Sequence, residues 1–211
     1  MSRLTFLIAV AVIATAWSLI QTADYAVWFF ELGLGALGVG LLAFTHHRLR
    51  FSRLVYVVAA VHFVILAQGA KYTYAEEPLF EWLRAALDLN RNHFDRLGHF
   101  AQGFTPALIT REVLLRRTTL ERGALVTLLS IAMPLAFSAM YELLEWIWVL
   151  LFYPDQGPEW LGMQGDPWDA QWDMLMALCG AVTALASLAW LQNRELSVEL
   201  AHPRLKSPAG T

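Results

Sequence analysis

Long stretches free of charged residues constrain this chain more than any other feature of its sequence. A helix that crosses the hydrocarbon core of a bilayer needs about 20 mostly apolar residues. Six segments of the 211-residue sequence approach that requirement, over residues 4–20, 25–45, 54–72, 95–110, 124–152 and 168–191. We therefore predict an all-α fold, in which residues 1–193 form one transmembrane bundle of about six helices and residues 194–211 form a mobile cytoplasmic tail.

The composition favours a membrane protein and argues against several other classes. Hydrophobic residues make up 57% of the chain and charged residues 16%, whereas about a quarter of the residues in soluble domains are charged. The net charge of −3 and the scattered basic residues argue against a nucleic-acid partner. No Gly-rich phosphate loop or nucleotide fingerprint occurs, so we expect no nucleotide partner. The single cysteine, Cys179, excludes an internal disulfide.

The distribution of basic residues predicts how the helices are oriented. Basic side chains concentrate after the second and fourth predicted helices and in the tail, at Arg48, Arg50, Arg53, Arg111, Arg116, Arg117, Arg122, Arg194, Arg204 and Lys206. The segments 21–24 and 153–167 contain neither Lys nor Arg. By the positive-inside rule, the basic segments and both termini are cytoplasmic. Residues 78–89 have the pattern of an amphipathic helix in the outer interface.

Three pairs of ionisable residues fall at the predicted outer ends of the last three helices. Members of each pair are three or four positions apart, so they share one helix face. The pairs are Asp95 with His99, Glu142 with Glu145, and Asp169 with Asp173. Because the fourth and sixth helices begin outside and the fifth ends there, we expect all six side chains to converge near the outer leaflet.

Charged side chains in a bilayer need compensation. Insertion of one at the bilayer centre costs about 2.5–3.5 kcal/mol, so such residues are paired, protonated, hydrated or bound to a cation. The compensating charge here is Arg91, Arg96, a protonated His93 or His99, or a divalent metal ion. Carboxylates mixed with imidazole do not fix the identity of that metal. The alternative is an ion-pair network that only holds the helices together.

Two further polar residues lie in predicted helices away from the pairs. Glu31 in the second helix and His62 in the third either join the site or are satisfied within the bundle.

Three motifs resemble those of the YjdF-like family of bacterial multi-pass inner-membrane proteins. They are NHFDRLGHFAQG at 92–103, YELLEW at 141–146 and QGDPWDAQWD at 164–173. The resemblance covers most of the chain and implies a location in the bacterial inner membrane, but no particular reaction. Polar residues of these motifs are additional site candidates, namely His93, Arg96, Gln102, Gln164, Asp166 and Gln171.

A more distant resemblance is to VanZ-like membrane proteins. Asp95, His99, Asp173 and Gly180 match their pattern of an Asp and a His four residues apart, followed by an Asp and a Gly seven residues apart. Arg96 stands where that pattern has Lys, and Ala177 where it has Asn.

These observations lead to one functional hypothesis and two alternatives. The hypothesis is a metal-dependent enzyme acting on a membrane lipid or a lipid-linked envelope precursor. Metal ligands would come from His99, Glu142, Glu145, Asp169 and Asp173, and the catalytic groups would be His99, Asp95, Glu142 and Glu145. The alternatives are a non-enzymatic transporter or ligand-binding membrane protein, and a structural subunit of an envelope complex.

Overall fold

Helices account for nearly all of the chain that the structure describes. The computed structural model describes residues 1–152, 154–156 and 163–201, which contain no β-strand. Its long elements are α1 (Arg3–Leu19), α2 (Tyr25–Thr45), α3 (Arg53–Tyr72), α4 (Pro78–Ala86), α5 (Phe94–Arg117), α6 (Ala124–Phe152) and α8 (Asp169–Ala201), with the 3-10 turns η1 (Pro154–Gln156) and η2 (Met163–Gly165) between α6 and α8. The predicted all-α bundle is confirmed.

Four of these helices, α2, α3, α6 and α8, are long and apolar enough to cross a membrane. Helix α1 is apolar but spans 17 residues. Helix α5 is more polar, and it is covered by neighbouring helices, with 12 of its 24 residues buried. The polar fourth segment of the sequence is therefore the helix that its neighbours shield from lipid.

The helices begin where side chains can cap them. The Asp24 carboxylate accepts hydrogen bonds from the backbone N–H groups of Ala26 and Val27 at the start of α2. The Glu77 carboxylate accepts one from Phe80 at the start of α4, where Pro78 occupies the first turn. Such contacts satisfy N–H groups that lack a partner within the helix.

Two helices are longer than predicted. Helix α5 continues to Arg117 rather than ending at 110, and α8 continues to Ala201 rather than ending at 191. The Arg111 guanidinium donates to the side chains of Gln192 and Asn193, so polar contacts keep the two helices paired beyond their apolar stretches. Residues 202–211 of the predicted tail, and 153 and 157–162 of the predicted outer loop, lie outside the described residues.

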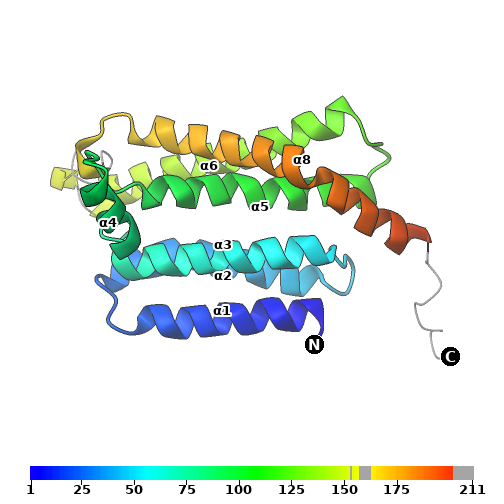
Figure 1. Ribbon diagram of the computed structural model, residues 1–211, viewed down its shortest axis with the longest axis horizontal. Coiled ribbons are helices and arrows are strands. Elements are labelled where there is room, and N and C mark those ends of the chain that lie inside the picture. The colour runs from blue at the N-terminus through cyan, green and yellow to red at the C-terminus, as the bar shows by residue number, and fades with distance from the viewer. Residues whose placement is uncertain (153, 157–162, 202–211) are drawn as a thin grey trace.

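The long helices form two layers (Figure 1). Helices α1, α2 and α3 make one layer and α5, α6 and α8 the other, and α3 packs against α5 between them. Helix α4 lies across one end of the bundle. We call this end, where α5 and α8 begin and α6 finishes, the site end.

Helices α5 and α8 approach each other closely because of two glycines. A Cβ atom at Gly103 would lie 1.8 Å from the backbone oxygen of Ala177, and one at Gly180 would lie 2.0 Å from that of Phe100. Small residues are the usual means by which membrane helices come into close contact. This contact fixes the start of α5 beside the start of α8.

Candidate functional site

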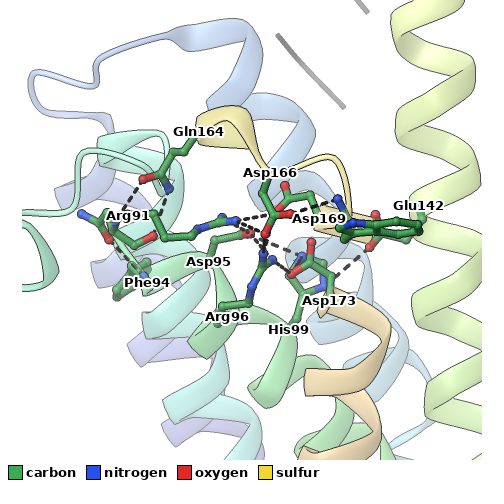
Figure 2. A network of polar contacts seen from close by, with 12 residues as sticks. Arg91, Phe94, Asp95, Arg96, His99, Glu142, Gln164, Asp166, Asp169 and Asp173 are labelled. Atoms are coloured by element: carbon green, nitrogen blue, oxygen red, sulfur yellow. Dashed lines mark hydrogen bonds and ion pairs between the residues drawn. The ribbon is translucent and has the colours of Figure 1, made fainter. Parts of the chain in front are cut away.

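The predicted acidic residues converge at the site end. Asp95 and His99 lie in the first turns of α5, Asp173 lies in the first turns of α8, and Glu142 lies on the last third of α6. Figure 2 shows these side chains pointing toward one another from the three helices. Of the six paired residues, Asp95, His99, Glu142 and Asp173 therefore meet as their spacing predicts.

Two arginines lie between the aspartates and compensate much of their charge. The Oδ1 atom of Asp169 accepts hydrogen bonds from both Arg91 and Arg96, each at 2.7 Å. Arg96 also pairs with Asp173, and both guanidinium groups lie 3.3 Å from Oδ2 of Asp166. Arg91 and Arg96 were two of the predicted sources of compensating charge, and the structure brings both into the cluster (Figure 2).

His99 has carboxylates at both ring nitrogens. Its Nε2 atom lies 3.5 Å from Oδ1 of Asp95 and 3.8 Å from Oδ1 of Asp173. Its Nδ1 atom lies 3.8 Å from Oε1 of Glu142, and both of these atoms are buried without a hydrogen-bond partner. His99 is 8% exposed. A buried imidazole with one unpartnered nitrogen is equipped to bind a ligand or move a proton.

Gln164 ties the segment before α8 to the segment before α5. Its side-chain amide accepts from the backbone N–H of Asn92 at 2.8 Å and donates to the Asn92 carbonyl at 2.9 Å. Gln164 has a φ of 57°, and this left-handed backbone occurs within the η2 turn. Asn92, in turn, donates to the Glu77 carbonyl and accepts from the N–H of Phe94. These bonds hold Arg91 and Asp166 at the cluster.

A cavity of about 190 Å³ adjoins the cluster and reaches into the bundle. Asp95, His99, Asp169 and Asp173 line its polar end. The sequence did not decide whether Glu31 and His62 join the site. Both border the cavity, and so does Glu145. The Tyr141 hydroxyl donates to Glu31 at 3.0 Å, whereas Nε2 of His62 is buried without a partner.

The remaining predicted site residues lie at different distances from the cavity. Gln102 borders it, with a buried and unpartnered Oε1 atom. His93 is the residue before α5 and gives no side-chain cap. Its burial, together with the neighbouring Arg91 and Arg96, lowers its pKa. Gln171 is exposed and is not among the residues that line the cavity.

Sequence reasoning missed two contributors, Asn92 and Tyr141. Both stand within the family-like motifs, directly before His93 and Glu142. Their roles depend on contacts to Gln164 and Glu31, which are distant in sequence. The position of a polar residue inside a motif was the only signal available for either.

Three residues of the cluster are arranged as metal ligands could be. One ligand atom each from Asp95, His99 and Asp173 lie within 4.8 Å of one another, and all three residues are buried. Two ligands that are each about 2.0–2.2 Å from one ion lie up to about 4 Å apart, so a small contraction would suffice to coordinate it.

Comparisons with known proteins agree with the membrane fold. The profile of the family described as "Predicted membrane protein (DUF2238)" matches residues 3–194. The inner membrane protein YjdF of Escherichia coli (strain K12) is 40% identical over 177 residues, which cover 84% of each chain. No solved structure gives a significant match. These matches do not support the VanZ-like resemblance.

The family profile covers nearly the whole chain, and the Escherichia coli relative is an inner-membrane protein. With four helices apolar enough to span a bilayer, the chain is a multi-pass protein of the bacterial inner membrane. It belongs to the DUF2238 family of membrane proteins, which includes YjdF.

Proposed function

We propose that this protein is a metal-dependent enzyme that acts on a lipid or lipid-linked envelope precursor at the outer leaflet. The observation that supports it best is the position of His99. This buried imidazole lies among Asp95, Asp173 and Glu142 and borders a cavity that continues into the membrane part of the bundle. A reactive group there would meet the polar part of a substrate whose apolar part stays in the membrane.

The metal would be held by Asp95, His99 and Asp173. Glu142 lies 3.8 Å from His99 and Asp169 shares Arg96 with Asp173, so both could act as further ligands or accept hydrogen bonds from bound water, and Glu145 borders the same cavity. Carboxylate and imidazole donors suit Zn²⁺, Mn²⁺ or Fe²⁺. When bound, such an ion supplies Lewis-acid activation of a substrate oxygen or of water.

The protein side chains supply orientation and proton transfer. Nε2 of His99 faces Asp95 and Asp173 and would therefore face the ion, so the carboxylate that would orient the imidazole through its other nitrogen is Glu142, whose Oε1 atom lies 3.8 Å from Nδ1. The Nδ1 atom and Glu142 then form a pair able to accept and return a proton on the side facing α6. Arg91 and Arg96 pair with the surrounding aspartates and supply positive charge beside them.

One observation favours a second candidate, a ligand-binding protein without catalysis. Arg96 already pairs with Asp173 and Asp169, so these carboxylates are compensated without any metal. A metal on Asp173 would share that carboxylate with a guanidinium group. In this second candidate, the cluster is a permanent ion-pair network and recognises a ligand through its remaining carboxylates.

Metal content distinguishes the two candidates. Protein purified in mild detergent without chelator is expected to contain about one divalent ion per chain by plasma mass spectrometry. The His99→Ala and Asp173→Asn variants should lose it, and a chelator should lower the melting temperature of the wild type but not of these two variants. The exposed His47 provides the control, because His47→Ala should retain the ion.

The metal-dependent enzyme proposal is excluded if folded wild-type protein holds no ion and if neither a chelator nor added Zn²⁺, Mn²⁺ or Fe²⁺ changes its melting temperature. The second candidate would then account for the cluster.

A further inference from the structure

The cavity beside the cluster is elongated along the helix axes. On α2 its lining residues run from Glu31 to Leu42, a distance of about 16 Å at the helical rise per residue. This is about half of the hydrocarbon thickness of a bilayer. Its shape therefore suits a chain that enters lengthwise rather than a compact solute.

The cavity changes from polar to apolar along its length. Glu31 and Glu145 border it at similar depths, about 10 Å from the ends of α2 and α6 at the site end. Farther from that end its lining is mostly apolar, with Leu42, Ala59 and Ile109 among the deepest residues and with His62 and Thr105 as the polar exceptions. Such a gradient matches a molecule with a polar head and a hydrocarbon tail.

Helix α2 leaves open space in the apolar part at Gly38, whereas Gly35 lies against Phe63 and Leu66 of α3. Gly35 and Gly38 line the cavity, and a Cβ atom added at Gly38 would meet nothing within 4 Å. Helices α2 and α6 meet nearer the site end, where Phe30 contacts Tyr141 and Trp148. Farther from the site end than these rings, Phe137 lines the cavity and is 38% exposed. The cavity therefore borders the lipid-facing surface at Phe137.

Two buried side chains that line the cavity carry polar atoms without a hydrogen-bond partner. His99 is 8% exposed and Gln102 is 9% exposed. Nδ1 of His99 and Oε1 of Gln102 have no hydrogen-bond partner, and both residues line the cavity. Unsatisfied buried polar atoms are uncommon in proteins. They indicate a ligand with polar atoms at the level where the cavity changes from polar to apolar.

The carboxylates at the polar end are not fully compensated. Arg91 and Arg96 pair with the aspartates, whereas no Lys, Arg or His among the described residues lies within ion-pair distance of Glu31 or Glu145. Carboxylates at this depth require a proton or a cation. A cationic group on the ligand would meet that requirement.

We propose that this cavity binds one hydrocarbon chain of a membrane amphiphile whose headgroup carries a protonated amine. The chain enters from the bilayer between α2 and α6, below Phe30, and lies along Gly35 and Gly38. The amine pairs with Glu31 and Glu145, and the adjoining headgroup atoms lie beside His99 and Gln102. This inference rests on the proposed function, because it names the substrate class of the same site.

Native mass spectrometry of detergent-purified protein tests the proposal. The probes are dioleoyl phosphatidylethanolamine, which has an amine, and dioleoyl phosphatidylglycerol, which has identical chains and none. The wild type should retain the amine lipid at least about tenfold better, equivalent to about 1.4 kcal/mol. Gly38→Leu should reduce retention of both lipids, because the new side chain fills the apolar part.

Matched variants separate the two parts of the claim. Gly40→Leu is the control, since Gly40 has equally open space and does not line the cavity. Glu31→Gln and Glu145→Gln should abolish the preference for the amine lipid without reducing retention of the phosphatidylglycerol. A diazirine in the chain of the amine lipid should crosslink wild-type protein at Leu34, Val39 and Phe137.

Equal retention of the two lipids by the wild type, or crosslinks spread evenly over the lipid-facing helices, would overturn the proposal. The crosslinking experiment needs no variant, so a misfolded Gly38→Leu protein would not leave the question open. Neither assay involves a metal or turnover. If the protein retains the amine lipid selectively but contains no metal, only the proposed enzyme function is excluded. If it contains metal but does not distinguish the two lipids, only this inference is excluded.

Discussion

Arg96 is the residue on which most of the acidic cluster depends. Its guanidinium group lies within 4 Å of carboxylate oxygens from Asp95, Asp166, Asp169 and Asp173, and its side chain is 10% exposed. Guanidinium presents five donors in a fixed plane, whereas an ammonium group is a compact point charge. One arginine can therefore pair at the same time with carboxylates from α5, from α8 and from the segment just before α8.

We expect Arg96→Ala to destabilise the protein strongly, because it leaves buried carboxylates without a partner. Removal of one member of a buried ion pair costs about 3–5 kcal/mol. Arg96→Lys should recover only part of the loss. The melting temperature in detergent measures both effects.

The matched control for Arg96 is Arg84, which pairs with Glu81 three residues earlier and whose side chain is 40% exposed. Arg84→Ala should leave the melting temperature unchanged, since exposed pairs contribute little. Equal losses for the two alanine variants would contradict a structural role for the buried cluster.

At this scale the sequence predicted which residues meet and named Arg91 and Arg96 among the candidates for the compensating charge, but it did not predict which carboxylate each arginine pairs with. Spacing of three or four residues placed Asp95 with His99 on one face, and topology brought that face to Asp173. The pairing of Arg91 with Asp169 depends on the loop that Gln164 anchors to Asn92. No periodic pattern encodes a loop conformation, so that contact was not predictable.

Among the elements, the pair formed by α5 and α8 has the closest contact. Gly103 and Gly180 each face the backbone of the other helix at a distance that leaves no room for a Cβ atom. Because Asp95 and His99 lie on one helix and Asp169 and Asp173 on the other, helix separation changes the site as well as the packing.

Gly103→Ala and Gly180→Ala should each force α5 and α8 apart. Overpacking of this kind costs about 1–3 kcal/mol and occasionally more, and the melting temperature should fall accordingly. Gly33→Ala is the control, because a Cβ atom there would meet nothing within 4 Å. An unchanged melting temperature in the Gly103 variant would show that the close contact is not needed for stability.

Helix positions were largely predictable, since α2 and α6 have the predicted bounds. The errors were at the ends of α5 and α8, where apolar residues give way to polar ones. A prediction from hydropathy ends each helix where the polar residues begin. In the structure both helices continue, because Glu112 and Gln192 are fully buried and hydrogen-bonded to each other. Tertiary contacts of this kind are not visible in a local pattern.

For the whole molecule, the arginine-rich segments and the acidic cluster occupy opposite ends of the bundle. The N-terminus and the end of α8 lie at the end away from α4 (Figure 1). The positive-inside rule then predicts that the site end faces away from the cytoplasm.

Cysteine labelling in intact cells tests this orientation. In a Cys179→Ser background, Ala75→Cys near the site end should react with a membrane-impermeant maleimide. Glu121→Cys, in the loop between α5 and α6, should react only after the cells are lysed. The reverse pattern would mean that the cluster faces the cytoplasm, and the outer-leaflet substrate would then be excluded.

The two layers of helices contribute different kinds of contact to the site. Every ion pair of the acidic cluster joins residues of the segment 91–173, whereas α2 contributes hydrogen-bonding, aromatic and apolar contacts to the cavity among the described residues. In the proposed amphiphile site, substitutions along α2 would therefore change which molecules bind while the charged centre keeps its geometry. On the proposed function, one half of the sequence would set which molecules bind, and the other half would hold the reactive groups.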